Sequence, residues 1–138
     1  MIGLGNAFRG DDAAGLEVAR RLGARSFEGE PVSLIDEWRD VDRLVLVDAM
    51  QSGAGAGAIR VVAAHAEALP AELRRPSTHL MGAAEAIELA RTLGFLPQET
   101  YVYAIEGERF DAGSGLSPAV NAAVGRVVEL IEEVLHDA

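Results

Sequence analysis

Apolar residues in this chain fall into short continuous runs and into longer stretches with helical spacing. Residues 44–47 form a continuous apolar run that ends in Asp48, which is typical of a strand buried on both faces of a parallel sheet. Residues 58–62 and 101–105 are rich in β-branched or aromatic side chains and predict two further strands. Residues 32–35 predict either an edge strand or the start of a short helix.

Three stretches show the spacing of amphipathic helices. The first covers residues 15–22 and follows two aspartates, whose charges suit the positive end of a helix dipole. The second is predicted over residues 79–94, after a Ser-Thr pair that can cap it and before a glycine that can end it. The third begins with Ser-Pro, a typical helix start, and carries an apolar face over residues 117–134.

The alternation of buried strands and amphipathic helices predicts one three-layer α/β/α domain over residues 1–138, with a mostly parallel sheet. In such sheets, ligands bind beyond the carboxyl ends of the strands. Three features follow strands here: the turn at residues 3–12, Asp48, and the loop after Ile105. We therefore expect them to converge on one functional site.

Composition narrows the classes of function. Hydrophobic residues make up 49% of the 138 residues, which is enough for an apolar core. A net charge of −10 would repel phosphate backbones and anionic lipids, so nucleic acid and membranes are not expected partners. The absence of cysteine excludes thiolate metal sites and cysteine nucleophiles. No segment has the pattern of a membrane span or a signal peptide, so the cytoplasm is the expected location.

A glycine-rich turn opens the chain, where Gly3, Gly5 and Gly10 precede Asp11 and Asp12. Such a turn after a strand can bind phosphate. The third glycine of a dinucleotide fingerprint is missing here, the Lys-Ser/Thr pair of a P-loop is absent, and two carboxylates would repel the ligand. We interpret Asp11 as a helix N-cap and assign a functional role to Asp12.

Asp48 has two interpretations. As a structural residue it would cap the turn that follows the strand. Burial would raise the pKa of an isolated carboxyl group at this position unless a partner compensated. Because functional side chains commonly follow strands of parallel sheets, we favour a functional role.

His79 is the third candidate. His65 and His136 lie in polar segments and are interpreted as solvated. His79 is predicted at a helix N-terminus, where the dipole keeps the imidazole neutral and able to bind a metal. Together with Asp12 and Asp48 it forms an oxygen and nitrogen set that suits a borderline divalent metal and leaves coordination positions open. The two carboxylates could instead activate water for peptide hydrolysis, and spacing does not separate these uses.

Four segments resemble, in the correct order, motifs of the hydrogenase maturation protease family. Residues 3–15 are similar to its opening G-x-G-N motif with paired acids and a glycine, and residues 46–49 to its apolar strand ending in Asp-Ala. Residues 77–79 are similar to its histidine before a helix, and residues 105–118 to its closing strand, loop and G-L-S-P helix start. The resemblance covers nearly the whole chain and implies a twisted sheet of about five strands.

The resemblance also implies an activity. Members of the family are aspartic-type endopeptidases that remove a C-terminal extension from the large-subunit precursor of a nickel–iron hydrogenase after nickel insertion. Asp12, Asp48 and His79 would recognise the nickel, which the substrate carries and the free enzyme does not hold tightly; Asp12 and Asp48 would be the catalytic candidates. Two alternatives stay open: a module that binds the nickel-loaded precursor without cleaving it, and a small nucleotide-binding α/β domain.

Two segments depart from the family pattern. Only Met1 and Ile2 precede the opening motif, which predicts either an unusually short first strand or a chain without its true start. Residues 29–31 stand where many members have a Gly-Gly-Thr-like turn, which leaves the second strand undefined. The three metal-facing residues lie outside both segments.

Overall fold

The computed structural model of the chain describes residues 1–28, 31–70 and 83–136. In chain order, the elements are β1 (Ile2–Leu4), the 3-10 turn η1 (Gly10–Ala13), α1 (Ala14–Leu22), β2 (Arg25–Phe27), α2 (Pro31–Asp36), β3 (Arg43–Met50), β4 (Ile59–Ala63), α3 (Ala83–Leu93), β5 (Glu99–Glu106) and α4 (Pro118–His136). None of the helices in these ranges is both long enough and apolar enough to cross a membrane.

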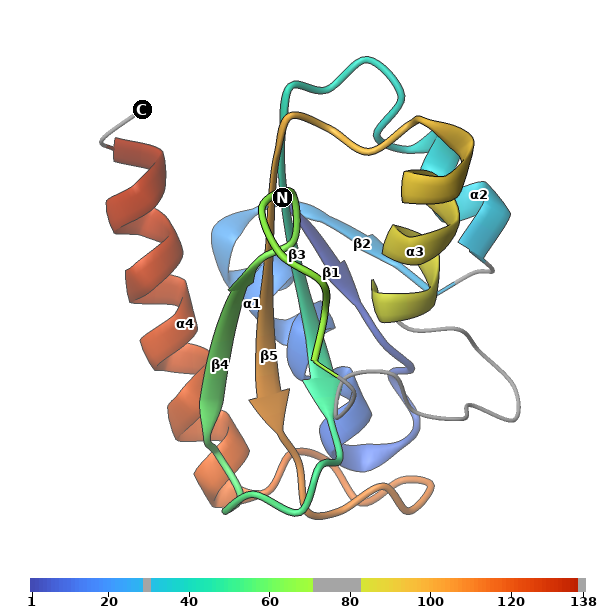
Figure 1. Cartoon of the computed structure of the whole chain (residues 1–138). Coiled ribbons are helices and arrows are strands. Elements are labelled where there is room, and N and C mark those ends of the chain that lie inside the picture. The colour runs from blue at the N-terminus through green and yellow to red at the C-terminus, as the bar shows by residue number, and fades with distance from the viewer. Residues whose placement is uncertain (29–30, 71–82, 137–138) are drawn as a thin grey trace.

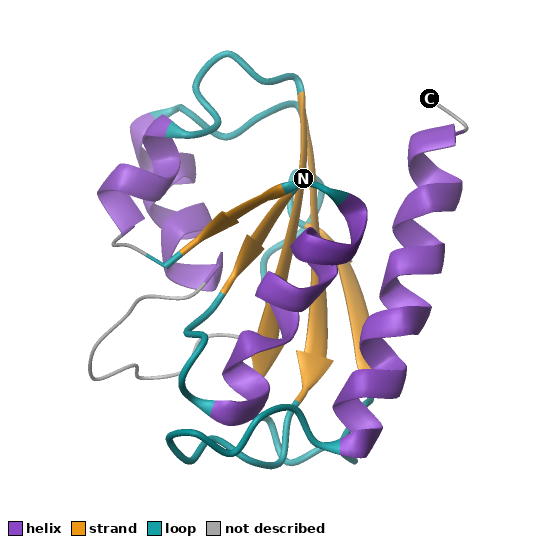
Figure 2. Ribbon diagram, turned by 180° about the vertical axis from the view of Figure 1, so that it is seen from behind, coloured by secondary structure: helices purple, strands orange, loops and turns teal. Residues whose placement is uncertain are grey.

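The strands form one sheet in the order β2-β1-β3-β5-β4. The first four strands in this order run parallel, and β4 pairs antiparallel with β5 at one edge. Helices α1 and α4 cover one face of the sheet, and α2 and α3 cover the other (Figures 1 and 2). The predicted three-layer domain with a mostly parallel sheet of about five strands is confirmed.

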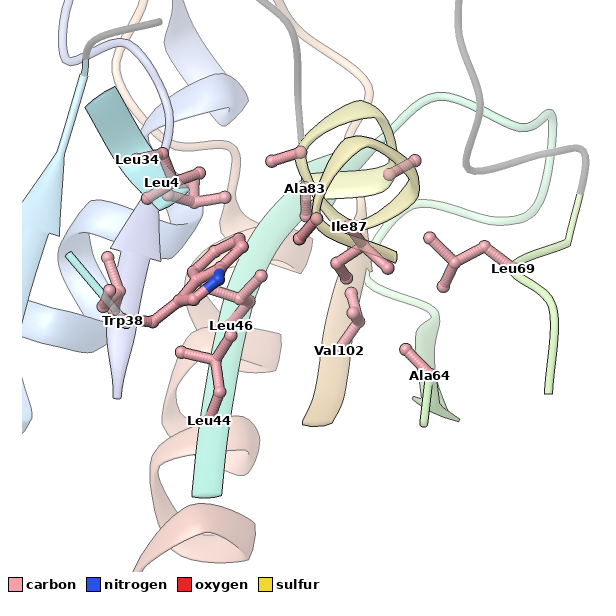
Figure 3. Packing of buried hydrophobic residues seen from close by; sticks show 14 of the residues in the cluster. Leu4, Leu34, Trp38, Leu44, Leu46, Ala64, Leu69, Ala83, Ile87 and Val102 are labelled. Carbon is pink, nitrogen blue, oxygen red and sulfur yellow. The ribbon is translucent and has the colours of Figure 1, made fainter. Parts of the chain in front are cut away.

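The central strand β3 supplies residues to a separate core on each face. Val45 and Val47 are buried in the cluster formed with α1 and α4. Leu44 and Leu46 are buried in the cluster formed with α2 and α3, where they lie beside Trp38 (Figure 3). This alternation explains why the strand reads as a continuous apolar run, because both of its faces pack against helices.

Short elements differ from the sequence prediction in detail. Residues 32–35 belong to helix α2, so the helix alternative is correct, and the edge strand lies earlier, at Arg25–Phe27. β1 is a strand of three residues. The predicted start of a helix at residue 79 lies outside the described residues. The described part of that helix, α3, ends at Leu93, directly before Gly94, as expected.

Helix α1 lies unusually close to the sheet. A Cβ atom added at Gly15 would lie 2.3 Å from the carbonyl oxygen of Val47 and 2.4 Å from that of Leu4. Distances this short are not found for real Cβ atoms, so only glycine permits this approach. The close contact sets the position of the β1–α1 connection, which carries Asp12.

Candidate active site at the carboxyl edge of the sheet

Strands β1, β3 and β5 run parallel, so their carboxyl ends lie at the same edge of the sheet, and β3 and β5 end toward the bottom of Figures 1 and 2. The connection after β1 and the loop after β5 are joined there by hydrogen bonds. The Asp11 N–H donates to the Arg109 carbonyl oxygen at 2.6 Å, and the Gly113 N–H donates to that of Phe8 at 2.8 Å. The convergence expected from the topology is confirmed for these segments.

Asp12 lies in the η1 turn and is partly buried. Its N–H donates to the Arg9 carbonyl oxygen at 3.0 Å, and its carbonyl oxygen accepts from the Asn6 N–H at 3.3 Å. A Cβ atom at Gly5 would lie 1.9 Å from the Asp12 carbonyl oxygen. The turn therefore folds back on itself, and the Asp12 backbone lies against the residue that directly follows β1.

Asp48 lies in β3, with 8% of its surface exposed. The strand continues two residues beyond it, to Met50, because β5 pairs with β3 up to that residue. The Oδ1 atom of Asp48 accepts a hydrogen bond from the Ala49 N–H at 2.9 Å, and Oδ2 accepts one from the Ala83 N–H at 3.0 Å. Asp48 thus has structural partners, as its alternative interpretation requires, and it connects the end of β3 to α3.

The register of the sheet relates Asp48 to Asp12. Gly3 of β1 pairs with Val47 of β3, so Asp48 follows at the level where β1 ends. The backbone of Asp12 lies against Gly5, just beyond that end. Two of the three predicted site residues therefore lie near the end of β1.

The third predicted residue, His79, lies outside the described residues. Among residues 1–28, 31–70 and 83–136, no group of three or more His, Asp or Glu residues is placed to hold a metal ion. His65 is exposed as expected, and its Nδ1 atom accepts a hydrogen bond from the Thr100 N–H at 3.0 Å. It lies at the opposite end of β5 from the candidate site.

Asp11 does not act as the predicted helix N-cap. No side chain caps η1 or α1, and Asp11 is fully buried against the loop after β5. Its Oδ2 atom accepts from the N–H groups of Glu108 and Arg109 and from the Ser117 hydroxyl, each at 2.9 Å. Its Oδ1 atom accepts from the Ser117 N–H at 2.7 Å. The N-cap interpretation is wrong because the Asp11 carboxylate instead accepts hydrogen bonds from groups at the start of α4 and in the loop before it.

These hydrogen bonds affect the ionisation of Asp11. Burial by itself raises the pKa of the carboxyl group, whereas hydrogen bonds from the Glu108, Ser117 and Arg109 N–H groups and from the Ser117 hydroxyl lower it. The hydrogen bonds outweigh burial, so the pKa of Asp11 lies below its usual value.

Because the pKa of Asp11 is lower in the folded state than in the unfolded state, the free energy of unfolding depends on pH in the acidic range. The contribution of Asp11 is fully present above its unfolded pKa, about 3.9, and is lost as pH falls through its lower folded pKa. We expect the free energy of unfolding, measured by urea denaturation between pH 6 and pH 2, to fall less steeply below about pH 4 in Asp11→Asn than in the wild type. Asp40→Asn, at an exposed position, should keep the wild-type slope. An unchanged slope in Asp11→Asn would contradict the assignment.

Glu106 is a further buried acid at this edge of the sheet, and its role is structural. It ends β5 with 2% of its surface exposed, and its carboxylate accepts hydrogen bonds from the Ser52 hydroxyl at 2.5 Å and from the Ser52 N–H at 3.0 Å. It therefore holds the start of the loop after β3. The pattern that marked Asp48, an apolar strand ending in an acid, thus also occurs at a carboxylate that holds a loop.

A model of the family described as hydrogenase maturation protease matches residues 29–134, so the chain belongs to this family of maturation endopeptidases. The matched range contains Asp48 and His79, and Asp12 precedes it.

Individual proteins are similar to this chain in sequence or in fold. The hydrogenase 2 maturation protease of Escherichia coli (strain K12) is 22% identical over all of this chain and 90% of its own length. The structure of the E. coli hydrogenase maturating endopeptidase HybD superposes with a TM-score of 0.77 at 20% identity, covering 99% of this chain and 90% of that one. The [NiFe] hydrogenase maturation protease HybD from Thermococcus kodakarensis gives a TM-score of 0.70 at 26% identity, with 96% and 95% covered.

Proposed function

We propose that this chain removes the C-terminal extension of a nickel–iron hydrogenase large-subunit precursor after nickel has been inserted. Family membership supports a maturation endopeptidase. The observation that supports the finer proposal is that Asp48 lies level with the end of β1 and that the Asp12 backbone lies against Gly5, just beyond that end. Both residues belong to segments at the edge where ligands of parallel α/β sheets bind. The expected cytoplasmic location belongs to the same proposal.

In this proposal the nickel ion is part of the substrate. Asp12, Asp48 and His79 supply two carboxylates and one imidazole, a set that suits a borderline divalent ion. Three protein ligands leave coordination positions for groups of the precursor that already hold the nickel. Binding of the ion at this edge would place the adjoining peptide of the precursor beside the two carboxylates.

The same carboxylates account for the aspartic type of hydrolysis that we propose. Peptide hydrolysis needs a base that takes a proton from the attacking water and an acid that returns a proton to the leaving nitrogen. Two carboxyl groups in different surroundings can divide these roles, because one stays ionised while the other is protonated. Asp48 is almost fully buried and Asp12 only partly so, which gives the two groups different surroundings.

Mass spectrometry of the precursor tests the proposal. Purified protein is incubated with nickel-loaded and with nickel-free large-subunit precursor, and the mass of each is followed with time. We expect the nickel-loaded precursor alone to lose its C-terminal extension. A precursor that binds the protein but keeps its full mass would favour the non-cleaving binding module and refute the protease proposal.

A further inference from the structure

Asp11 makes several hydrogen bonds between the turn that carries Asp12 and the loop after β5. Asp11 contributes its own N–H to Arg109 and accepts four hydrogen bonds through its carboxylate. The residues that donate to the carboxylate are 97 to 106 positions away in the sequence. Asp11 therefore joins the first connection of the fold to the last one.

The η1 turn depends on such external contacts for its position. It has four residues and no side-chain cap, and 3-10 turns of this length have poor hydrogen-bond geometry of their own. Gly10 reinforces the contact, because a Cβ atom there would lie 2.4 Å from both the Arg109 carbonyl oxygen and the Ser114 hydroxyl. The turn is thus packed tightly against the loop at residues 107–117.

We propose that Asp11 is a positioning residue for the cleavage reaction, whose buried carboxylate fixes η1, and with it Asp12, against the loop before α4. The inference rests on the proposed function, because it gives Asp11 a role in the same site. Asp12 follows Asp11 directly, so a shift or rotation of η1 would move the Asp12 carboxylate relative to Asp48. Misplacement by about 1 Å can cost a catalysed reaction roughly 100-fold in rate.

Asp11 itself does not contact the substrate in this proposal. It has no exposed surface, and both carboxylate oxygens already accept hydrogen bonds from the protein. Glu106 provides a matched comparison, since it is an equally buried acid at the same edge that holds Ser52 instead. If Asp11, like Glu106, only stabilised the fold, substitution of either residue would affect cleavage to the same extent.

The first test compares the cleavage kinetics of Asp11→Asn and Asp11→Ala with those of Glu106→Gln on nickel-loaded precursor. We expect kcat to fall about 10- to 100-fold in the Asp11 variants, with KM close to the wild-type value. Asn keeps one acceptor oxygen but places an amide group against one of the donors, so its loss should be smaller than that of Ala. Glu106→Gln should keep kcat near the wild-type value. Wild-type kcat in a folded Asp11→Ala protein would overturn the proposal.

Amide hydrogen exchange gives a second readout that needs no substrate. In Asp11→Ala we expect faster exchange at residues 10–14 and 108–109, with unchanged protection in β3 and in the second half of α4. Exchange at residues 10–14 that matches the wild type would overturn the positioning role.

If the wild type cleaves nothing, the proposed function fails and exchange alone decides the role of Asp11. If Asp11→Ala does not fold, Ser117→Ala, which removes one of the donors, is measured in both ways with smaller changes expected.

Discussion

Asp12→Asn should abolish processing of the nickel-loaded precursor while the protein stays folded. The substitution replaces one carboxylate oxygen by an amide group, which neither binds nickel as a carboxylate does nor takes a proton from water. Main-chain hydrogen bonds with Asn6 and Arg9 hold residue 12, and these persist in the variant. Loss of a general base alone lowers a rate by roughly 100- to 10,000-fold. Cleavage is measured by mass spectrometry and folding by circular dichroism.

Asp40→Asn provides the control, because it makes the same change of charge at an exposed position before β3, at the opposite edge of the sheet. It should process the precursor at the wild-type rate. Asp48→Asn is less informative on its own, since Asp48 also accepts hydrogen bonds from the main chain at the end of β3 and at the start of α3. Full processing by Asp12→Asn would show that Asp12 is not part of the site. The proposed mechanism would then lack the second carboxylate that it needs beside Asp48.

The sequence predicts the layers of the fold because long elements carry a strong periodic signal. Residues 44–47 are apolar throughout since both faces of β3 pack against helices, and this marks a central parallel strand. The convergence of the turn after β1 with the loop after β5 follows from the rule that parallel strands end at one edge. Short elements lack such a signal: three residues in β2 and six in α2 do not complete a recognisable period.

The site could be predicted only in part, for a different physical reason. The position of Asp48 could be inferred because it depends on its own strand, whereas the role of Asp11 depends on donors about 100 residues away. No local pattern distinguishes an acid that caps its own helix from one that accepts hydrogen bonds from a distant loop. Glu106 had the same strand-end pattern as Asp48, but its partner Ser52 lies beyond a different strand.

Gly15→Ala should destabilise the protein even though alanine is the better helix former. Alanine in place of glycine stabilises a helix interior by about 1 kcal/mol. At position 15 the added methyl group would overlap the carbonyl oxygens of Val47 and Leu4, which belong to paired strands and cannot move independently. Overpacking of this kind typically costs about 1–3 kcal/mol, so we expect a net loss in the free energy of unfolding, measured by urea denaturation. Moving α1 away from the sheet should also displace Asp12 and lower the processing rate.

Gly125→Ala is the matched substitution with the opposite expected sign. Gly125 lies within α4, and a Cβ atom there would meet only the Arg21 guanidinium, at 3.7 Å, an ordinary contact distance. With no overlap to offset the helix preference, the free energy of unfolding should rise by about 0.5–1 kcal/mol, and processing should be unchanged. Equal stabilisation by both substitutions would show that α1 can move away from β1 and β3 at little cost. The position of Asp12 would then be set by Asp11 and the loop after β5 rather than by the packing of α1.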